Sequence, residues 1–308
     1  MSTYSSNLTR LGLCCAILLT GGFAACANAE EYVKSYSVGG RANVHVHAQY
    51  GAVSVTTSDD TKVEFDVRYD KRDWASALPI DSRQDGNVVE LTALLDPQSW
   101  WGWGHFSNRR LSIEVRMPKN ADLQLETSNG AVDVSFLNGN ISIHTSNGRI
   151  RAEQLSGMID VGSSNAEITL DSLTGTVKVR TSNGAISATH LDGKCELSTS
   201  NSWIQATGRF ESLDITSNNG GVVARAESGS RMSAGWNIRT TNAGVDLSLP
   251  TDLKANLDAG TSNGGVALDL PVTMQGYQSG TQLRGVLNGG GPELSVHTSN
   301  GRIRVRGI

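Results

Sequence analysis

The sequence predicts an all-β protein built around a parallel β-helix, or β-solenoid, with coils of 18 residues. The octapeptide H-T-S-N-G-R-I-R at 144–151 recurs unchanged at 297–304. Apolar and polar residues alternate on both sides of each T-S-N-G motif, which is the period of a β-strand. A fixed period of this kind indicates one supersecondary unit stacked on itself. The asparagines of the motif follow one another in steps of 18 residues: Asn129, Asn147, Asn165, Asn183, Asn201 and Asn219.

One unit runs from Gly139 to Ser156, numbered here as unit positions one to eighteen. Apolar residues occupy positions three and five before the motif and positions twelve and fourteen after it. Each unit is therefore predicted to form two short strands around a turn, followed by a link that ends at a leucine. These leucines are Leu137, Leu155, Leu173 and Leu191.

The T-S-N-G turn allows two predictions. An Asn-Gly turn is typical of a two-residue hairpin, which would give an antiparallel meander. Equivalent columns match from unit to unit, however, which favours coils that stack like on like and pile the asparagines into a ladder. Thr at position seven and Asn at position nine are expected to point inward. Glycine at position ten is expected to supply a positive φ. These glycines are Gly130, Gly148, Gly184 and Gly220.

Residues 1–29 have the pattern of a signal peptide. Arg10 is their one charge, residues 11–25 form an apolar run, and Ala27-Asn28-Ala29 fits the small-x-small cleavage rule. Cys26 offers an alternative, because its surroundings resemble a bacterial lipoprotein box and would give a lipid anchor. Both alternatives predict export to the periplasm, the outer membrane or the cell surface, with no transmembrane span in the mature chain.

Charge and cysteine content exclude two classes of protein. The whole chain has a net charge of −4, and removal of Arg10 leaves 25 basic against 30 acidic residues, or −5. No basic excess is available to neutralise phosphates, which argues against a nucleic-acid partner. Cys14 and Cys15 leave with the signal peptide, and Cys195 lies in the apolar column at position three. A disulfide framework is therefore not expected.

Two parts are predicted in the mature chain. Residues 30–118 are rich in β pattern but lie outside the 18-residue register, although Gly51 looks like a degenerate copy of the turn. Residues 119–308 form the repeats, regular over 121–227 and looser over 228–308, where insertions fall in surface loops.

The run M-P-K-N-A-D-L-Q-L-E-T-S-N-G-A-V at 117–132, followed by L-x-G-x-I-x-I-x-T-S-N-G-x-I units, resembles the bacterial putative-adhesin β-strand-repeat family. The resemblance covers at least residues 111–308. It implies a parallel β-helix-like stack, an extracytoplasmic location, and a role in adhesion or envelope-stress sensing. That family is a domain of unknown function, so the resemblance supplies no catalytic residue.

The sequence supports an enzyme, a metal site or a repeated ligand-binding surface less well than it supports a structural or adhesive protein. A left-handed β-helix acyltransferase needs an aliphatic residue at every sixth position. The apolar unit positions here, three, five, twelve and fourteen, do not follow that spacing. A polysaccharide lyase or hydrolase needs clustered acids, and outward position four is mixed. His45 and His47 form a candidate metal pair without a third ligand. The repeated Thr, Ser and Asn side chains could form a ligand-binding surface, but we expect them to hydrogen-bond one another along the turns. No catalytic residue, metal or cofactor is predicted.

Arginines and tryptophans supply the remaining candidates. Arg149/Arg151 and Arg302/Arg304/Arg306 form basic stripes, interpreted as solvated charge or as a contact for anionic lipid or polysaccharide. Trp203 and Trp236 are expected to pack in the core. The candidate contact residues for a ligand or partner form an aromatic loop, which could instead cap the stack. They are Trp100, Trp101, Trp103 and Phe106.

The function predicted from these observations is that of a non-enzymatic, exported, structural or adhesive β-solenoid. Its partner is expected to be a surface glycan, a protein or another envelope component. The alternative hypothesis is an envelope-stress regulator that senses an antimicrobial peptide or a signalling partner. An enzyme that acts on polysaccharide is the least favoured.

Overall fold

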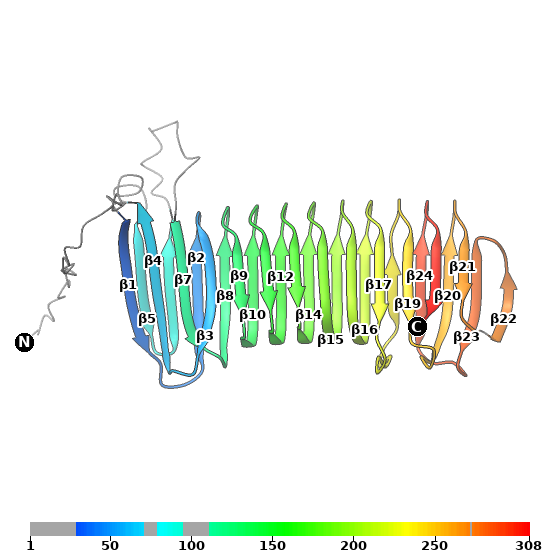
Figure 1. The fold of residues 1–308 in the computed structure, drawn as a ribbon, viewed down its shortest axis with the longest axis horizontal. Coiled ribbons are helices and arrows are strands. Elements are labelled where there is room, and N and C mark those ends of the chain that lie inside the picture. The colour runs from blue at the N-terminus through cyan, green and yellow to red at the C-terminus, as the bar shows by residue number, and fades with distance from the viewer. Residues whose placement is uncertain (1–28, 71–78, 95–110, 272) are drawn as a thin grey trace, which may run out of the picture.

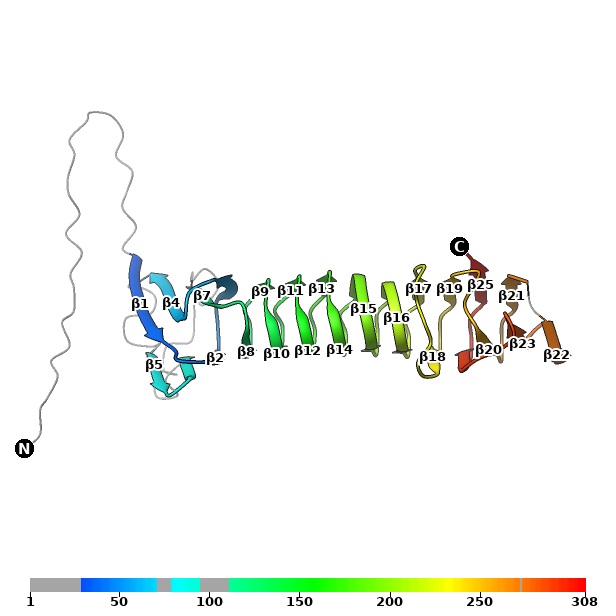
Figure 2. The same ribbon diagram turned by 90° about the horizontal axis from the view of Figure 1, so that it is seen from below.

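The computed structural model describes residues 29–70, 79–94, 111–271 and 273–308. These residues form strands and turns, with no helix among them. The strands lie in two sheets that face each other along one elongated stack, as Figures 1 and 2 show from two directions. This arrangement confirms the predicted β-solenoid.

Sheet one contains the strands that lead into the T-S-N-G turns, together with the strands that extend this sheet at both ends. In spatial order they are β5 (Ile80–Asp85), β6 (Val88–Ala93), β2 (Ala42–Ala48), β8 (Ala121–Thr127), β10 (Asn138–Thr145), β12 (Ser156–Ser163), β14 (Thr174–Thr181), the second halves of β15 (Ile186–Thr199) and β16 (Ile204–Ser217), β18 (Trp236–Arg239), β24 (Glu293–Thr298), β20 (Ala255–Thr261), β23 (Gln282–Leu287) and β22 (Thr273–Gln278).

Sheet two contains the strands that leave the turns, together with its own end strands. In spatial order they are β1 (Ala29–Ser37), β4 (Lys62–Asp70), β7 (Leu111–Pro118), β3 (Ala52–Ser58), β9 (Val132–Ser135), β11 (Ile150–Glu153), β13 (Ile168–Asp171), the first halves of β15 and β16, β17 (Val222–Ala226), β19 (Val245–Leu249), β25 (Ile303–Gly307) and β21 (Val266–Asp269). β15 and β16 run from sheet two into sheet one and so join the two.

Equivalent columns stack on one another in parallel. Ile141 pairs with Leu123 on one side and Ile159 on the other. In sheet two, Ile150 pairs in the same way with Val132 and Ile168. The antiparallel meander is therefore wrong for the repeats, because each strand pairs with its counterpart one coil away. The alternating burial along these strands places positions three, five, twelve and fourteen in one continuous core.

The order of the coils in space differs from their order in the chain at both ends of the stack. The coil β2–β3 lies between β6–β7 and β8–β9. The last coil, β24–β25, lies between β18–β19 and β20–β21. The degenerate unit around Gly51 is thus stacked against the regular repeats, and the second octapeptide copy lies inside the stack.

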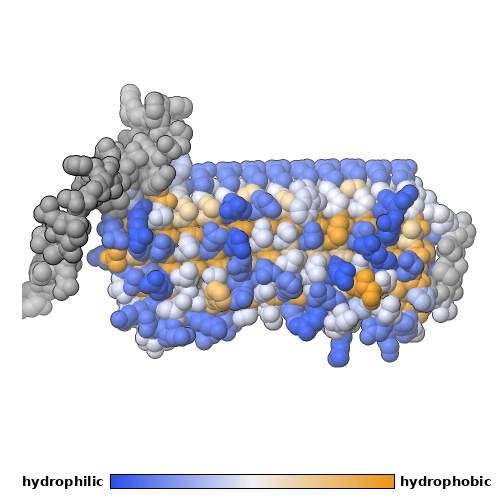
Figure 3. Space-filling model, viewed as in Figure 1, coloured by the Kyte–Doolittle hydropathy of each residue, from blue (hydrophilic) through white to orange (hydrophobic). Residues whose placement is uncertain are grey.

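The motif asparagines form a hydrogen-bonded row that is longer than the six-residue ladder expected. In each case Nδ2 donates to Oδ1 of the asparagine in the preceding coil, at 2.6 to 2.9 Å. In the described coils the row runs Asn129, Asn147, Asn165, Asn183, Asn201, Asn219, Asn242, Asn300 and Asn263. The regular members are exposed, so the expected inward direction is wrong for asparagine. Figure 3 shows a hydrophilic line along this edge of the stack.

The residue at position seven points inward, as expected, and in several coils its hydroxyl connects neighbouring turns. The Thr181 hydroxyl accepts a hydrogen bond from the Gly184 amide at 3.1 Å. One coil later, the Thr199 hydroxyl donates to the Gly184 carbonyl at 3.0 Å. Both side chains are buried. A buried hydroxyl needs such partners, because leaving it without one costs about 1–3 kcal/mol.

Glycine at position ten is required for close approach and not for positive φ. None of the predicted glycines has a positive φ. A Cβ on Gly148 would instead lie 1.7 Å from the carbonyl oxygen of Gly130 in the neighbouring coil, and a Cβ on Gly220 would lie 1.6 Å from that of Ser202. The prediction was wrong because the backbones of stacked turns approach more closely than an isolated turn would require.

Positive φ angles occur at the opposite corner, at positions sixteen and one. Position sixteen holds Phe136, Gln154, Ser172 and His190, with φ of 52° to 63°. Position one holds Gly157, Gly175 and Gly193, with φ of 116° to 124°. The left-handed conformation therefore falls partly on residues with side chains, which sequence rules do not anticipate.

The two tryptophans in the repeats differ in burial. Trp236 is buried and packs edge-to-face on Phe210, as expected. Trp203 is 44% exposed, so the packing prediction is wrong for it. Trp203 takes unit position eleven, immediately before β16, where the side chain faces out of sheet two. Cys195 is buried, and this burial, with a smaller effect of Asp192, raises the pKa of its thiol to about 12.

Candidate functional site

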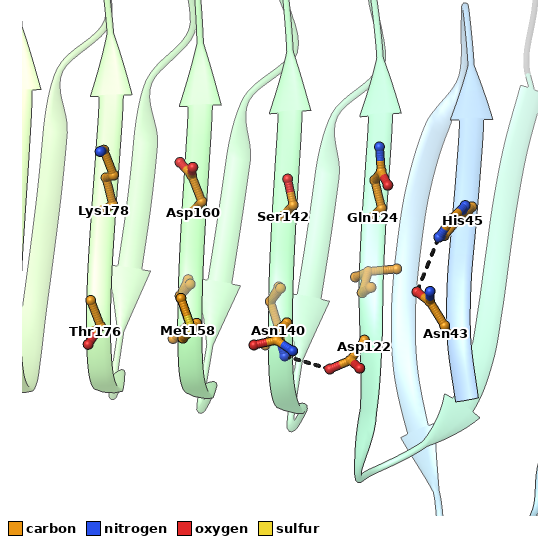
Figure 4. A pocket seen from close by; sticks show the side chains of 13 residues that line it. Asn43, His45, Asp122, Gln124, Asn140, Ser142, Met158, Asp160, Thr176 and Lys178 are labelled. Carbon is orange, nitrogen blue, oxygen red and sulfur yellow. Dashed lines mark hydrogen bonds between the residues drawn. The ribbon is translucent and has the colours of Figure 1, made fainter. Parts of the chain in front are cut away.

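The outer face of sheet one is hollowed over β2, β8, β10, β12 and β14. The hollow is a shallow groove of about 490 Å³, seen from close by in Figure 4. Unit positions two and four supply its polar and exposed side chains, because they alternate with the buried positions three and five. Its labelled lining residues are Asn43, His45, Asp122, Gln124, Asn140, Ser142, Met158, Asp160, Thr176 and Lys178.

At the β2 end of the groove the polar side chains are held by one another. His45 Nε2 lies 3.2 Å from Asn43 Oδ1. Asp122 accepts hydrogen bonds from the guanidinium of Arg41, at 2.9 and 3.1 Å, and from the Asn140 amide at 2.8 Å. Burial raises the pKa of the Asp122 carboxyl, but these hydrogen bonds outweigh it and hold that pKa below its ordinary value. Asp122 is therefore a fixed anion that orders this end.

The middle of the groove contains side chains that are free to meet a ligand. Asp160 lies in register between Ser142 and Lys178. Among the described residues the side chains of Asp160 and Thr176 have no hydrogen-bond or ion-pair partner, whereas the Lys178 ammonium lies 3.4 Å from a Glu196 oxygen. Met158 is 64% exposed beside them. The groove thus presents a carboxylate, a hydroxyl and an exposed thioether on one rigid sheet (Figure 4).

A second hollow of about 430 Å³ continues from the groove towards the T-S-N-G edge. It is lined by His47, Glu126 and His144, which occupy position six of three adjacent strands, and by Leu94. His47 Nδ1 lies 3.4 Å from a Glu126 carboxylate oxygen. His144 instead folds over Gly162, where an added Cβ would lie 2.7 Å from the ring. No three potential metal ligands converge within the described residues.

The predicted site residues are distributed differently from this groove. Trp100, Trp101, Trp103 and Phe106 lie outside the described residues, in the segment that joins β6 to β7, and Cys26 lies outside them as well. His45 lines the groove, and His47 lines the hollow beside it. In the part of the chain that the structure describes, no apolar helix is long enough to cross a membrane.

Sequence reasoning missed Asp160, Met158 and Thr176 as a group. The available signal was their placement at outward positions two and four of successive units, since stacked units bring equivalent positions side by side. Column four contains no repeated acid, and the groove combines different residue types from two columns. A mixed column does not stand out in a single sequence.

Three comparisons place the chain among known proteins. A family model described as Toastrack DUF4097 matches residues 42–306, which confirms the resemblance found in the sequence. No curated protein matches significantly. A solved structure of a putative cell adhesion protein from Clostridium sporogenes ATCC 15579 is 12% identical and covers 91% of this chain and 100% of its own, with a TM-score of 0.25.

Two further solved structures have similar coverage. A putative adhesin from Bacteroides fragilis NCTC 9343 is 11% identical, covers 91% of this chain and 97% of its own, and has a TM-score of 0.37. A putative lipid binding protein from Parabacteroides distasonis ATCC 8503 is 11% identical, covers 90% and 96%, and has a TM-score of 0.38. At these low scores, function has to be argued from the groove itself.

Proposed function

This chain belongs to the Toastrack DUF4097 family, and we propose that it is a non-enzymatic, exported adhesive protein whose groove on sheet one binds a hydroxyl-rich glycan. The observation that carries this proposal is the unpaired Asp160 beside the exposed Met158 and Thr176. Export is supported by the signal-peptide pattern of residues 1–29.

The chemistry of the groove suits a sugar. Neighbouring hydroxyls of a pyranose can donate to one carboxylate, and hydrogen bonds to a charged group contribute about 1.5–3 kcal/mol each. The Met158 thioether is soft and adaptable, so it can pack against the C–H face of a ring. The shallow, elongated shape fits an extended chain lying across several strands. Binding then needs only complementary positioning, since no bond in the ligand has to be broken.

A rigid stack also suits adhesion. Each strand beneath the groove is paired in parallel on both sides, and the asparagine row continues this pairing at the turns. Such a surface keeps its backbone in a fixed position, so little backbone conformational entropy is lost on binding.

The test is binding of neutral oligosaccharides of glucose, galactose and N-acetylglucosamine, immobilised on a surface. We expect the wild type to bind at least one of them and Asp160→Asn to weaken binding about tenfold or more, the loss of one charged hydrogen bond. Asp214→Asn is the matched control, because Asp214 occupies unit position four on the same face but lies outside the groove. Absence of binding by the wild type, or equal effects of the two variants, would overturn the proposal.

A further inference from the structure

The arginines of the described chain fall into two groups. Most pair with a carboxylate on the same or a neighbouring strand; those with such an ion pair are Arg41, Arg68, Arg83, Arg116, Arg151, Arg180, Arg209, Arg284 and Arg306. The described arginines without one are Arg149, Arg225, Arg231, Arg239, Arg302 and Arg304. All but Arg149 lie at residue 225 or later, so unpaired positive charge gathers towards the C-terminal end of the stack.

Three of these arginines share the outer face of sheet two with exposed apolar side chains. Arg225 is on β17, Arg302 immediately precedes β25, and Arg304 is on β25. Val223 is also on β17 and is 48% exposed, and Trp203, which is 44% exposed, immediately precedes β16 in the adjacent coil. β19 lies between β17 and β25. We call these five residues the arginine face. Figure 3 looks onto this sheet and shows strongly hydrophilic residues near its C-terminal end, with hydrophobic ones beside them.

Arg302 is unpaired because its neighbours in the stack are glycines. The Arg302 carbonyl accepts from the Val245 amide, next to Gly244, and the Ile303 amide donates to the Gly265 carbonyl. Neither neighbouring coil therefore offers a carboxylate at unit position eleven. Arg302 is exposed, and its neighbours at this position have no side chains.

Arg304 is unpaired because the adjacent acid is already engaged. Arg304 lies in register between Asp246 and Ala267. Asp246, however, has its carboxylate 3.3 Å from the Arg306 guanidinium. Arg302 immediately precedes β25 and Arg304 is its second residue, so the two side chains point to the same side with a spacing of about 6.6 Å.

The identical octapeptide earlier in the chain has different charged neighbours, some supplied by the residues that follow it and some by the adjacent coil. Glu153 follows Arg151 by two residues, whereas Arg306 follows Arg304 by two. Arg151 forms an ion pair with Glu153. Arg149 lies beside Glu167, whose carbonyl accepts from the Ile150 amide. The same eight residues thus form a locally neutral surface in one coil and a positively charged surface in the other.

We propose that the arginine face binds the phosphate headgroups of an anionic lipid surface. A guanidinium offers two parallel donors that match two phosphate oxygens. Trp203 and Val223 distinguish a lipid surface from a dissolved anion, because an indole and an aliphatic side chain gain by entering the headgroup region. The five side chains leave one face of sheet two within four adjacent coils, those of β16, β17, β19 and β25, so one surface can contact them together.

The experiment is sedimentation of purified protein with vesicles of phosphatidylcholine, with and without phosphatidylglycerol. We expect binding only to the vesicles that contain phosphatidylglycerol, and weaker binding at high salt. The double variant R302Q/R304Q should bind roughly 25-fold more weakly, since each basic side chain near an anionic surface contributes about fivefold. The matched control is R149Q/R151Q, which changes the same two positions of the other octapeptide and should stay within about twofold of wild type. Circular dichroism checks that both variants fold.

Trp203→Ala separates a lipid surface from soluble phosphate. We expect this variant to bind the anionic vesicles more weakly, and we expect inorganic phosphate to compete only poorly for the wild type. Equal binding of wild type and R302Q/R304Q to the vesicles would overturn the proposal. It would also be overturned if Trp203→Ala had no effect while inorganic phosphate displaced the protein completely. Glycan binding through sheet one is independent of every one of these outcomes.

Discussion

Asn263 donates from Nδ2 to Oδ1 of Asn300 at 2.8 Å, although Asn300 follows it by 37 residues. Asn300 in turn donates at 2.8 Å to Asn242, which lies 58 residues earlier. The turn of the last coil is therefore held between two turns that precede it in the chain. The chain leaves a space one coil wide after β19 and fills that space only when β24 and β25 are in place.

Leu294 should be essential to this inserted coil. It is fully buried and pairs with Trp236 on one side and Leu257 on the other. Leu294→Ala should lower the free energy of unfolding by about 2–5 kcal/mol, because it leaves a cavity between three coils. Ile308→Ala, at a 40% exposed position, should change it by about 0.5 kcal/mol or less. Urea unfolding measures both, and equal effects would contradict the inserted arrangement.

The asparagine row should contribute measurably to stability in spite of its exposure. Asn183 donates to Asn165 and accepts from Asn201, so Asn183→Ala removes both of its hydrogen bonds within the row. We expect a loss of about 1–2 kcal/mol in the free energy of unfolding. Ser182→Ala, one residue earlier at an exposed position, is the control and should be nearly neutral. If the two variants unfold at the same urea concentration, the row has no stabilising role.

Two adjacent glycines should respond oppositely to a methyl group. A Cβ on Gly220 would lie 1.6 Å from the Ser202 carbonyl oxygen, whereas a Cβ on Gly221 would meet its nearest atom at an ordinary 3.5 Å. Gly220→Ala must push two coils apart, and we expect it to cost about 1–3 kcal/mol. Gly221→Ala should be tolerated, and the restricted unfolded chain even favours it. Thermal unfolding of the pair decides this, and a more harmful Gly221→Ala would refute the close-approach explanation.

The corner opposite the asparagine row should show a pH dependence. His190 Nδ1 lies 2.7 Å from an Asp171 carboxylate oxygen. The hydrogen bond with Asp171 raises the pKa of His190 above its ordinary 6.5, and the same bond holds the pKa of Asp171 below its ordinary 3.8. The histidine contribution is fully present below pH 6.5 and is lost as pH rises through the raised pKa. The aspartate contribution is present above pH 3.8 and is lost as pH falls through the lowered pKa.

The pair is therefore fully charged, and most stabilising, between about pH 4 and 6.5. Asp171→Asn should lower the pKa of His190 towards its ordinary value, as measured by NMR titration of its ring protons. Glu153→Gln changes the same unit position one coil earlier and should leave His190 unaffected. A His190 titration that does not move in Asp171→Asn would show that another group sets its pKa.

Much of the fold was predictable because the repeat is local. The steps between Asn129 and Asn219 gave the coil length, and the alternation around residues such as Ile141 and Ile150 gave the core columns. The role of Gly148 could not be predicted, because the nearest atom belongs to the neighbouring coil. The prediction for Trp203 failed for a different reason: unit position eleven alternates with the buried position twelve, so this side chain faces outward in spite of its size.

The groove was less predictable than the fold. Asp160 and Met158 belong to one strand, whereas Thr176 comes from the next, and each stands in a column of mixed composition. Their joint exposure depends on the partners of the surrounding charges, such as the pairing of Lys178 with Glu196. These ion-pair partners depend on side-chain geometry between coils, which produces no repeating pattern in the sequence.

By itself, the sequence determined the unit of this protein: two strands, a polar turn and an apolar interior, because these follow from alternation and turn chemistry within 18 residues. Tertiary structure decided which unit lies next to which. The two copies of H-T-S-N-G-R-I-R have the same local structure, yet Arg149 lies beside Glu167 and Arg302 lies beside two glycines. The physical reason is that a surface in a solenoid is shared by coils adjacent in space, and at both ends of this stack those coils are not adjacent in the chain.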